Sequence, residues 1–395
     1  MTRRLHNLRE SKRFAPFEPA AKALRDPQRK RPVGAPMSIH EVAKRAKVSI
    51  ATVSRTINGV PTVDPHLSRR VWKVIAELGY YPNTQARALV SGRSRIFGLI
   101  VSEITNPFFP EIVQGFEDMA VQHNYEVLLT STVHDSKRMA HSVRRMIERQ
   151  VEGVAVVTFG MEEALFEDLK ARNVPLVFID VGPPLPRISN IRIDYLHGIR
   201  QAVQHLAAFG HERIAFISGP LALKSAAARQ HAFLRSIEEL GLSVDRRCLI
   251  EGNHTMDGGI AAMKTLLALP KRPTAVICSN DMTAIGAMRE SYEQGVRIPR
   301  DLSVIGFDDI RLAQFVTPPL TTVRMSQTEI ARLAFHALLA EVQRKAPVPT
   351  GTEYTLSTSL VLRDSTAIAP HAAGREKGSS APEEGSERRR ARDFD

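Results

Sequence analysis

The residues whose chemistry is clearest lie in a short stretch between Ser49 and Asn58. Arg55 carries a guanidinium that can pair bidentately with O6 and N7 of guanine. Ile50 and Ala51, about one helical turn earlier, offer only apolar contact, for which the methyl group of thymine is the natural mate. Four more side chains carry short hydrogen-bonding groups suited to phosphate, namely Ser49, Thr52, Ser54 and Asn58. This set predicts contact with the major groove of duplex DNA.

Two short helices would present these residues. Ser38, with Glu41 three residues later, has the spacing of a capping box, which predicts a helix from Ile39 to about Ala46. Ser49 would cap a second helix that ends at Asn58-Gly59, where glycine allows the left-handed conformation of a helix stop. The turn between them is only a few residues long, as in a helix-turn-helix motif.

A third helix would bury the first two. Asp64-Pro65 combines a good N-cap with proline at the first helical position, and Gly79 would end the helix. Its apolar positions recur on one face, namely Leu67, Val71, Ile75 and Leu78, with Trp72 between them as a packing residue. The second helix of such a motif enters the major groove with its N-terminus first. An ordinary three-helix bundle with a charged surface is the alternative interpretation.

The composition of the whole chain agrees with a polyanionic partner. The 395 residues are many for one compact core, at about 100–200 residues per domain, and 43% of them are hydrophobic. The formal net charge of +12 favours nucleic acid first and an anionic membrane second. No apolar run approaches the ~18 residues of a membrane span, and the basic N-terminus lacks the apolar core of a secretory signal. The two cysteines, Cys248 and Cys278, fit a reducing compartment, and we expect a cytoplasmic, nucleoid-associated protein.

The pattern of the chain changes after the basic helices. From Ile96 onward, apolar runs alternate with amphipathic stretches, which predicts parallel sheets with helices on both faces. The runs are IFGLIV, YEVLLTS, GVAVVT, PLVFID, RIAFISG, TAVICSND and LSVIGFDD. Several end in small or polar residues, where an open α/β sheet places its ligand crevice. Residues 1–36 and 365–395 lack apolar periodicity, and we expect a disordered basic arm and a disordered tail.

The sequence offers little for catalysis. It contains no GxSxG elbow, Gly-rich phosphate loop or HExxH motif, and no cluster has metal-ligand spacing. Asp308 and Asp309 are adjacent at an expected strand end, so their side chains would point to opposite sides. His205 and His211 are expected to pack and cap a helix end. We therefore expect neither an enzyme nor a bound cofactor.

The same residues carry a resemblance to a known family. Residues 38–94 contain the pattern IxxVAxxAxVSxxTVSRxxNG, then the segment AELGYYPN and an Ala-x-x-Leu pair. Further along come NPFF, GHERIAFISGP, SNDxxAxGA, GFDD and PPLTTV. Together these motifs resemble the lac repressor/galactose repressor family of bacterial transcription regulators, over roughly residues 38–363.

The resemblance implies a small all-α helix-turn-helix headpiece and an α/β two-lobed domain of the periplasmic-binding-protein-like (type I) fold, with parallel sheets. The expected boundaries are 37–82 for the headpiece, 83–95 for a hinge helix and linker, 96–193 with 324–342 for the N-terminal lobe, and 194–323 with 353–364 for the C-terminal lobe. A ligand in the cleft would close the lobes and change the spacing of two headpieces. A homodimer of this kind calls for a pseudo-palindromic operator. The tail lacks the leucine heptads of tetrameric relatives, so we expect a dimer.

For the hinge segment NTQARALV, the resemblance implies a helix that folds only on DNA and pairs with the same segment of a second subunit. Asn83 begins this segment, and Ala86 matches a small residue that permits close approach. Leu89 matches a leucine wedge inserted into the minor groove at the centre of the site. Such a wedge unstacks a base step and bends the duplex. A plain linker is the alternative.

For the cleft, the resemblance implies a set of ligand-facing residues. Arg229 matches the family's cleft arginine, Asp308 the acid that accepts ligand hydroxyls, and Asn280 the amide beside it. The others are Asp180 at the end of VFID, Phe108 and Phe109 in NPFF, and Ser225. A carboxylate, a guanidinium and an aromatic surface suit a sugar, a sugar acid or a nucleoside. Because Ala227 stands where some relatives carry a second basic residue, an anionic ligand has less support.

These observations predict a sequence-specific DNA-binding transcription regulator. We expect a repressor that binds its operator as a homodimer and responds to a small polar metabolite, with no membrane among its partners. In one alternative, a partner protein docks on the lobes in place of the metabolite. In another, the chain is a small-molecule transport protein, which would need a secretory signal.

Overall fold

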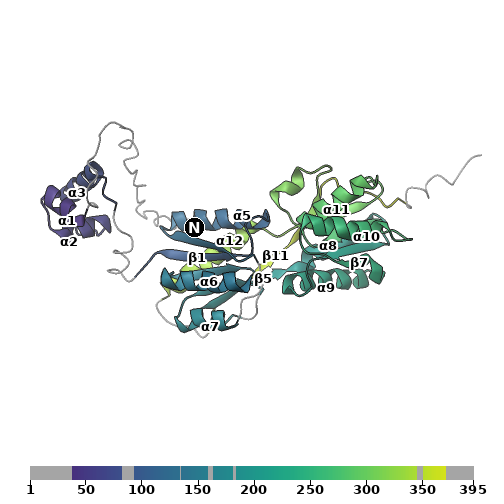
Figure 1. The fold of residues 1–395 in the computed structure, drawn as a ribbon, viewed down its shortest axis with the longest axis horizontal. Coiled ribbons are helices and arrows are strands. Elements are labelled where there is room, and N and C mark those ends of the chain that lie inside the picture. Colours follow the sequence, from purple (N-terminus) through teal and green to yellow (C-terminus); the bar gives the residue numbers. More distant parts are fainter. Residues whose placement is uncertain are drawn as a thin grey trace, which may run out of the picture. The chain divides into compact units, whose positions relative to one another are not determined.

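The computed structural model describes residues 38–81, 93–133, 135–158, 163–180, 184–344 and 350–370 (Figure 1). The chain divides into two compact units, residues 1–93 and residues 94–395. The expected basic arm, residues 1–36, and the hinge residues Asn83, Ala86 and Leu89 lie outside the described part of the chain.

The first unit contains the three predicted helices, α1 (Ile39–Ala46), α2 (Ile50–Ile57) and α3 (Pro65–Leu78). The Oγ of Ser49 caps α2 by accepting a hydrogen bond of 3.1 Å from the Thr52 N–H. Asp64 Oδ1 caps α3 by accepting from the backbone N–H groups of His66 and Leu67. The two predicted caps therefore fix where α2 and α3 begin.

The capping box expected at Ser38 does not form. Ser38 holds the N-cap position of α1, but its side chain makes no cap hydrogen bond. The backbone N–H of Glu41, which a capping box would give to the serine hydroxyl, donates to the Ser38 carbonyl at 3.1 Å. The Glu41 N–H therefore has a backbone acceptor and does not need the serine hydroxyl.

A small apolar core joins the three helices. The buried residues from α1 and α2 pack against those of α3, and they are Val42, Ala43, Ala46, Val53, Val71, Val74, Ile75 and Leu78. Trp72 is partly buried against this core, which confirms its predicted packing role. The core holds α2 with Val53 and Thr56 inward, so the opposite side of the helix remains exposed.

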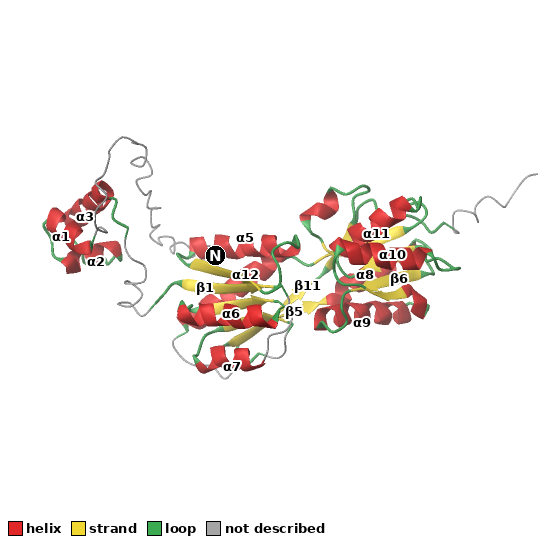
Figure 2. Ribbon diagram, in the orientation of Figure 1, coloured by secondary structure: helices red, strands yellow, loops and turns green. Residues whose placement is uncertain are grey.

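The second unit contains two lobes, each built on a six-stranded sheet in the described residues (Figure 2). In the N-terminal lobe the strand order is β11-β5-β4-β3-β1-β2, and all neighbours are parallel. The strands are β1 (Ile96–Val101), β2 (Glu126–Ser131), β3 (Gly153–Val157), β4 (Leu176–Ile179), β5 (Ile188–Asp194) and β11 (Glu353–Ser357). One face is covered by α5 (Phe108–Gln122) and α12 (Gln327–Gln343), the other by α6 (Ser136–Glu148) and α7 (Glu163–Ala171).

In the C-terminal lobe the strand order is β12-β10-β9-β8-β6-β7. The strands are β6 (Ile214–Ser218), β7 (Leu249–Glu251), β8 (Ala275–Cys278), β9 (Ser303–Asp308), β10 (Thr321–Arg324) and β12 (Ser359–Val361), with β12 antiparallel to β10. Helix α8 (Tyr195–Ala208) packs on α9 (Lys224–Glu239), and α10 (Met256–Leu267) packs on α11 (Asp281–Glu293). The short 3-10 helices η2 (Arg246–Cys248) and η3 (Arg311–Gln314) complete the lobe. All seven predicted strands are present, and the α/β two-lobed fold is confirmed.

The chain passes between the lobes three times, after β5, after β10 and after β11. The last passage corrects the expected boundary, because β11 pairs with β5 in the N-terminal lobe and only β12 belongs to the C-terminal lobe. Thr358, fully buried between these strands, fixes the crossing point. Its hydroxyl donates to the Asp194 carbonyl at 2.6 Å and accepts from the Gly198 N–H at 3.0 Å, so two of the passages are bonded together.

The end of the described chain is also better ordered than expected. The segment 365–370, which we assigned to a disordered tail, packs on the C-terminal lobe. Ser365 is fully buried and its hydroxyl donates to the Val304 carbonyl, while the Ala367 carbonyl is hydrogen-bonded to His211 Nε2 at 2.9 Å. Because a carbonyl only accepts, His211 Nε2 is the donor in that bond. His205 and His211 thus hold the end of the lobe, in line with their predicted packing role.

Candidate functional site

The exposed side of α2 carries the residues predicted to read bases. Ile50, Ala51 and Arg55 are all exposed, and Ile50, a large apolar residue, is 41% exposed. Val53 and Thr56 face the core instead. The exposed apolar side chain of Ile50 suits contact with a thymine methyl, and the exposed guanidinium of Arg55 suits a hydrogen-bonded contact with a neighbouring guanine.

The short polar side chains of the headpiece are partly engaged with one another. The hydroxyls of Ser49 and Thr52 lie 2.9 Å apart, and Asn58 Nδ2 donates weakly to Ser54 Oγ at 3.5 Å. Their remaining hydrogen-bonding capacity is on the exposed side of the helix or at its ends. A helix N-terminus with Ser49 at its cap also favours a phosphate through the helix dipole.

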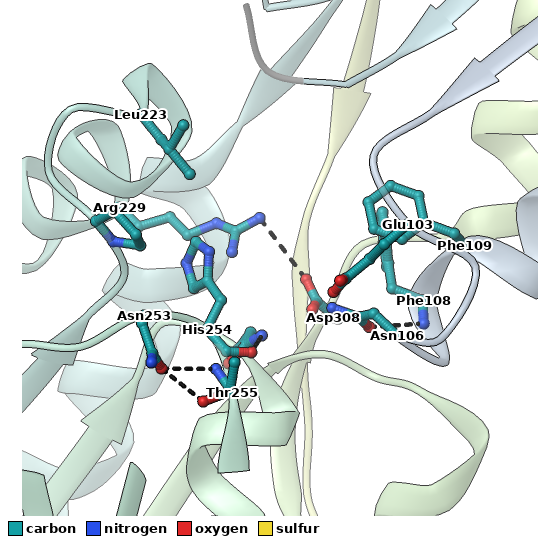
Figure 3. A pocket seen from close by; sticks show the side chains of 12 residues that line it. Glu103, Asn106, Phe108, Phe109, Leu223, Arg229, Asn253, His254, Thr255 and Asp308 are labelled. Atoms are coloured by element: carbon teal, nitrogen blue, oxygen red, sulfur yellow. Dashed lines mark hydrogen bonds and ion pairs between the residues drawn. The ribbon is translucent and has the colours of Figure 1, made fainter. Parts of the chain in front are cut away.

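A cavity of about 410 Å³ lies between the two lobes of the second unit (Figure 3). This volume is within the range of roughly 300–1,000 Å³ typical of small-molecule sites. Its lining includes five of the seven predicted ligand-facing residues, which are Phe108, Phe109, Arg229, Asn280 and Asp308. The first two come from the N-terminal lobe, and the other three from the C-terminal lobe.

Arg229 and Asp308 form a buried charged pair at this cavity. Arg229 Nη2 lies 3.7 Å from Asp308 Oδ1, and the two side chains are 5% and 7% exposed. Arg229 Nη1 donates to the Ser279 carbonyl at 2.6 Å. The guanidinium also lies over Phe307, with Cζ 4.3 Å from the ring centroid, so the ring face helps to hold the charge.

Asp308 is held in an unfavourable setting for a carboxylate. Burial raises its pKa from 3.8 to about 7, although Arg229 acts in the opposite direction. Asp281, the buried first residue of α11, has its pKa raised well above 3.8 by burial and by the neighbouring charge of Asp308. A hydroxyl-bearing ligand that donates to Asp308 would replace the water that this carboxylate has lost.

The next residue, Asp309, serves a different purpose. Its carboxylate accepts hydrogen bonds of 2.6 Å from Arg324 and from Arg363. Both aspartates have positive φ, 110° for Asp308 and 57° for Asp309, and this backbone turns their side chains to different surroundings. The prediction that the two side chains point in different directions is therefore confirmed.

Asn280 and the two phenylalanines shape the cavity wall. Asn280 Oδ1 caps α11 by accepting from the Thr283 N–H, and its Nδ2 donates to the His254 carbonyl, both at 2.9 Å. Phe108 and Phe109 begin α5, and their rings meet edge to face with centroids 5.3 Å apart. They give the N-terminal lobe an apolar wall on which a sugar or base can pack.

Asp180 and Ser225 are not among the lining residues. Asp180 has a φ of 53° and turns its Oδ1 to the backbone N–H of Ile193, at 2.8 Å, so it ties β4 to β5. Burial raises the pKa of this carboxyl. Ser225 is 1% exposed in the first turn of α9.

Several lining residues escaped the sequence analysis, in particular Glu103, Asn253, His254 and Thr255. Glu103 comes two residues after β1, at the same sheet edge as the residues that we did select, so strand-end reasoning could have found it. The other three follow β7, an edge strand of three partly exposed residues whose apolar signal is too short to recognise.

In the described residues, no group of histidine, cysteine, aspartate or glutamate side chains is arranged to hold a metal ion. The helices of the same residues include none that is long and apolar enough to cross a membrane.

Two family models match the chain. Residues 38–83 match the model of bacterial regulatory proteins of the lacI family, and residues 203–366 match that of the periplasmic binding protein-like domain. The first covers the three headpiece helices and the second most of the C-terminal lobe.

Curated relatives and solved structures agree with these matches. Catabolite control protein A of Priestia megaterium is 35% identical over 76% of this chain and 91% of its own length. The HTH-type transcriptional repressor CytR of Escherichia coli (strain K12) is 35% identical over 84% of this chain and 97% of its own. A lac repressor dimer bound to operator and the anti-inducer ONPF matches with a TM-score of 0.75 at 28% identity, covering 84% of this chain and all of that one. A complex of the transcriptional regulator CelR with cellobiose matches with a TM-score of 0.63 at 28% identity, covering 83% and 99%.

The relatives named here are transcriptional regulators, and their similarity spans both the DNA-binding headpiece and the two-lobed domain. The chain belongs to the lacI family of bacterial regulatory proteins and is a DNA-binding transcription regulator.

Proposed function

We propose that this regulator is a repressor that binds a pseudo-palindromic operator as a homodimer, in the cytoplasm, and that a small polar metabolite in the cavity between the lobes controls its affinity. The buried pair of Arg229 and Asp308 at the wall of that cavity is the observation that carries the effector part of the proposal. The two opposite charges are largely removed from water, and their hydrogen-bonding groups can contact a ligand in the cavity.

The DNA-binding part rests on the exposed side of α2. Arg55, Ile50 and Ala51 are the proposed base contacts, with Ser49, Thr52, Ser54 and Asn58 as proposed contacts to phosphate. From the family resemblance, Asn83, Ala86 and Leu89 are the proposed hinge contacts in the minor groove. A dimer places two such heads on the two halves of an inverted repeat.

The proposed effector site combines Phe108, Phe109, Arg229, Asn280 and Asp308. Carboxylate, guanidinium and aromatic rings in one cavity match the hydroxyls and the apolar face of a sugar or a nucleoside. CelR, one of the solved relatives, is described with cellobiose bound, which supports a sugar-like ligand here as well. For Asp180 and Ser225, which do not line the cavity, the proposed role is to support the site from behind its lining.

A structural connection from the cavity to the other lobe supports control by closure. Gln327, the first residue of α12, donates through Nε2 to the backbone carbonyl of Asp308 at 2.8 Å. Asp309 is joined to Arg324, the last residue of β10, at the second passage between lobes. A ligand that moves the Asp308–Asp309 turn would therefore act directly on a segment that crosses between the lobes.

The experiment that tests this proposal is isothermal titration calorimetry of the full chain against a panel of sugars and nucleosides. Each binder is then added to a complex of the protein with operator DNA, and the change in affinity is followed by fluorescence anisotropy. We expect at least one compound to bind and to shift the operator affinity by about fivefold or more. A compound that binds and leaves operator affinity unchanged would contradict control by the cavity, and control by a partner protein would then be the better account.

A further inference from the structure

One carboxylate in the cavity lining, that of Glu103, is not among the proposed effector-binding residues. Glu103 lies between β1 and α5 and lines the cavity from the N-terminal lobe. Figure 3 shows its side chain extending from that lobe toward the space between the lobes, on the same side as Phe108 and Phe109. The structure shows no hydrogen bond or ion pair from a described residue to this carboxylate, and the side chain is partly exposed.

Arg229 carries the positive charge that could balance Glu103, but its guanidinium already has other partners. Arg229 donates to the Ser279 carbonyl, lies over Phe307 and faces Asp308 at 3.7 Å. Among the described residues that line the cavity, there is no lysine and no other arginine. In this described lining, the two acids, Glu103 and Asp308, therefore outnumber the one permanent cation, and the charge contributed by the N-terminal lobe is that of Glu103.

This distribution of charge restricts the ligand. A phosphate or carboxylate near Glu103 would meet a like charge in a partly desolvated place, and no second cation is available to screen it. A hydroxyl near Glu103 would donate to a carboxylate that has free acceptor positions, and the rings of Phe108 and Phe109 would cover the adjacent C–H surface. An ionised acceptor makes a stronger hydrogen bond than a neutral one.

We propose that Glu103 is a specificity-determining residue that selects an uncharged, hydroxyl-bearing effector and rejects its phosphorylated or acidic analogues. This inference rests on the proposed effector role of the cavity and narrows it: of the sugars, sugar acids and nucleosides that fit, it keeps the neutral sugars and nucleosides. The ligand hydroxyl donates to Glu103 from the N-terminal lobe while Asp308 and Arg229 hold the opposite end from the C-terminal lobe, so the ligand bridges the lobes.

The test uses matched pairs that differ by one anionic group. Calorimetry compares ribose with ribose 5-phosphate, glucose with glucose 6-phosphate and with glucuronate, and adenosine and cytidine with their 5′-monophosphates. The proteins are the wild-type chain, Glu103→Gln, and Glu117→Gln as a control that removes the same charge from an exposed position of α5 outside the cavity. Arg229→Ala identifies which binding events occur in the cavity.

For a compound whose binding is lost in Arg229→Ala, we expect wild-type protein to prefer the neutral member at least tenfold, which corresponds to about 1.4 kcal/mol. Glu103→Gln should weaken the neutral ligand and reduce that preference at least fivefold, and Glu117→Gln should leave it unchanged. The inference is overturned if an anionic member binds as tightly as its neutral partner, or if Glu103→Gln preserves the preference while binding still needs Arg229. If no compound binds, or if binding is indifferent to Arg229→Ala, the proposed effector cavity fails and the inference falls with it.

Discussion

Gln327 joins the two lobes at the residue that faces the cavity. Its side-chain amide, at the start of a helix in the N-terminal lobe, donates to the backbone carbonyl of Asp308 in the C-terminal lobe at 2.8 Å, and Gln327 is buried. The Asp308 side chain is thus available to a ligand while its backbone is tied to the opposite lobe. Asp308 thus both lines the cavity and makes a hydrogen bond between the lobes.

This connection predicts the behaviour of Gln327→Ala. Removing the amide takes away one link between the Asp308 turn and α12, so a bound ligand should change the position of the lobes less. We expect ligand affinity to change less than threefold while the ratio of operator affinities with and without ligand falls at least threefold. Anisotropy titrations with labelled operator measure that ratio. A variant with an unchanged ratio would show that the link carries no coupling.

A second prediction concerns stability and the charge on Asp308. Burial raises its pKa from 3.8 to about 7, so the folded protein holds this proton more tightly than the unfolded chain does. The folded state therefore loses stability as the pH rises from about 4 to about 7. Asp308→Asn cannot ionise, and in the absence of ligand its free energy of unfolding should exceed that of the wild type at pH 8 by roughly 2–4 kcal/mol.

Urea unfolding of both proteins at pH 8 and at pH 4.5 checks this prediction, and the difference should shrink at the lower pH. Asp309→Asn is a matched control, because Asp309 accepts from two arginines and its loss should destabilise the protein. An Asp308→Asn variant that is less stable than wild type at pH 8 would mean that the pair with Arg229 outweighs the cost of burial.

The third prediction concerns base reading by Arg55. Arg55→Ala should weaken binding to the preferred operator by about 1–3 kcal/mol and relax the preference at one base pair of each half-site, since its exposed guanidinium has the geometry to pair bidentately with guanine. Competition with single-base operator variants measures this. An equal loss on every sequence would assign Arg55 to phosphate instead.

The fourth prediction follows from the family resemblance of the hinge segment. Leu89→Ala should weaken operator binding and reduce DNA bending, because the smaller side chain unstacks a base step less effectively. A circular-permutation gel assay reports the bend, and binding to random DNA should stay the same. Full bending by the variant would rule out Leu89 as the wedge.

The fold was predictable where burial dictates the residue types. Six of the seven apolar runs became buried strands, because parallel strands covered on both faces need continuous apolar residues. The seventh, β2, lies at a sheet edge and is only partly buried. Four of the seven residues of β5 and three of the four residues of β10 are polar, and β7 and β12 are only three residues long, so none of these strands has a clear apolar signal. β11 was assigned to the other lobe because sequence order does not reveal which sheet edge a late strand joins.

The site was predictable to the level of the sheet edge. The family resemblance indicated Asp308 and Asp180, which both lie at strand ends, yet of these two only Asp308 lines the cavity. The direction of each side chain depends on its backbone, and both residues adopt a positive φ that no pattern in the sequence announces. Glu103 was missed although it follows a strand in the same way, since strand-end position alone does not say which polar residue faces a ligand.

The proposed function requires two identical headpieces that read an inverted repeat. Selection of bound duplexes from a random pool by the purified full-length chain, followed by sequencing, tests it most directly. We predict enrichment of an inverted repeat with the same half-site on both strands, and binding that survives at physiological salt. Enrichment of a single unrepeated motif, or retention of random DNA that disappears as salt is added, would contradict it.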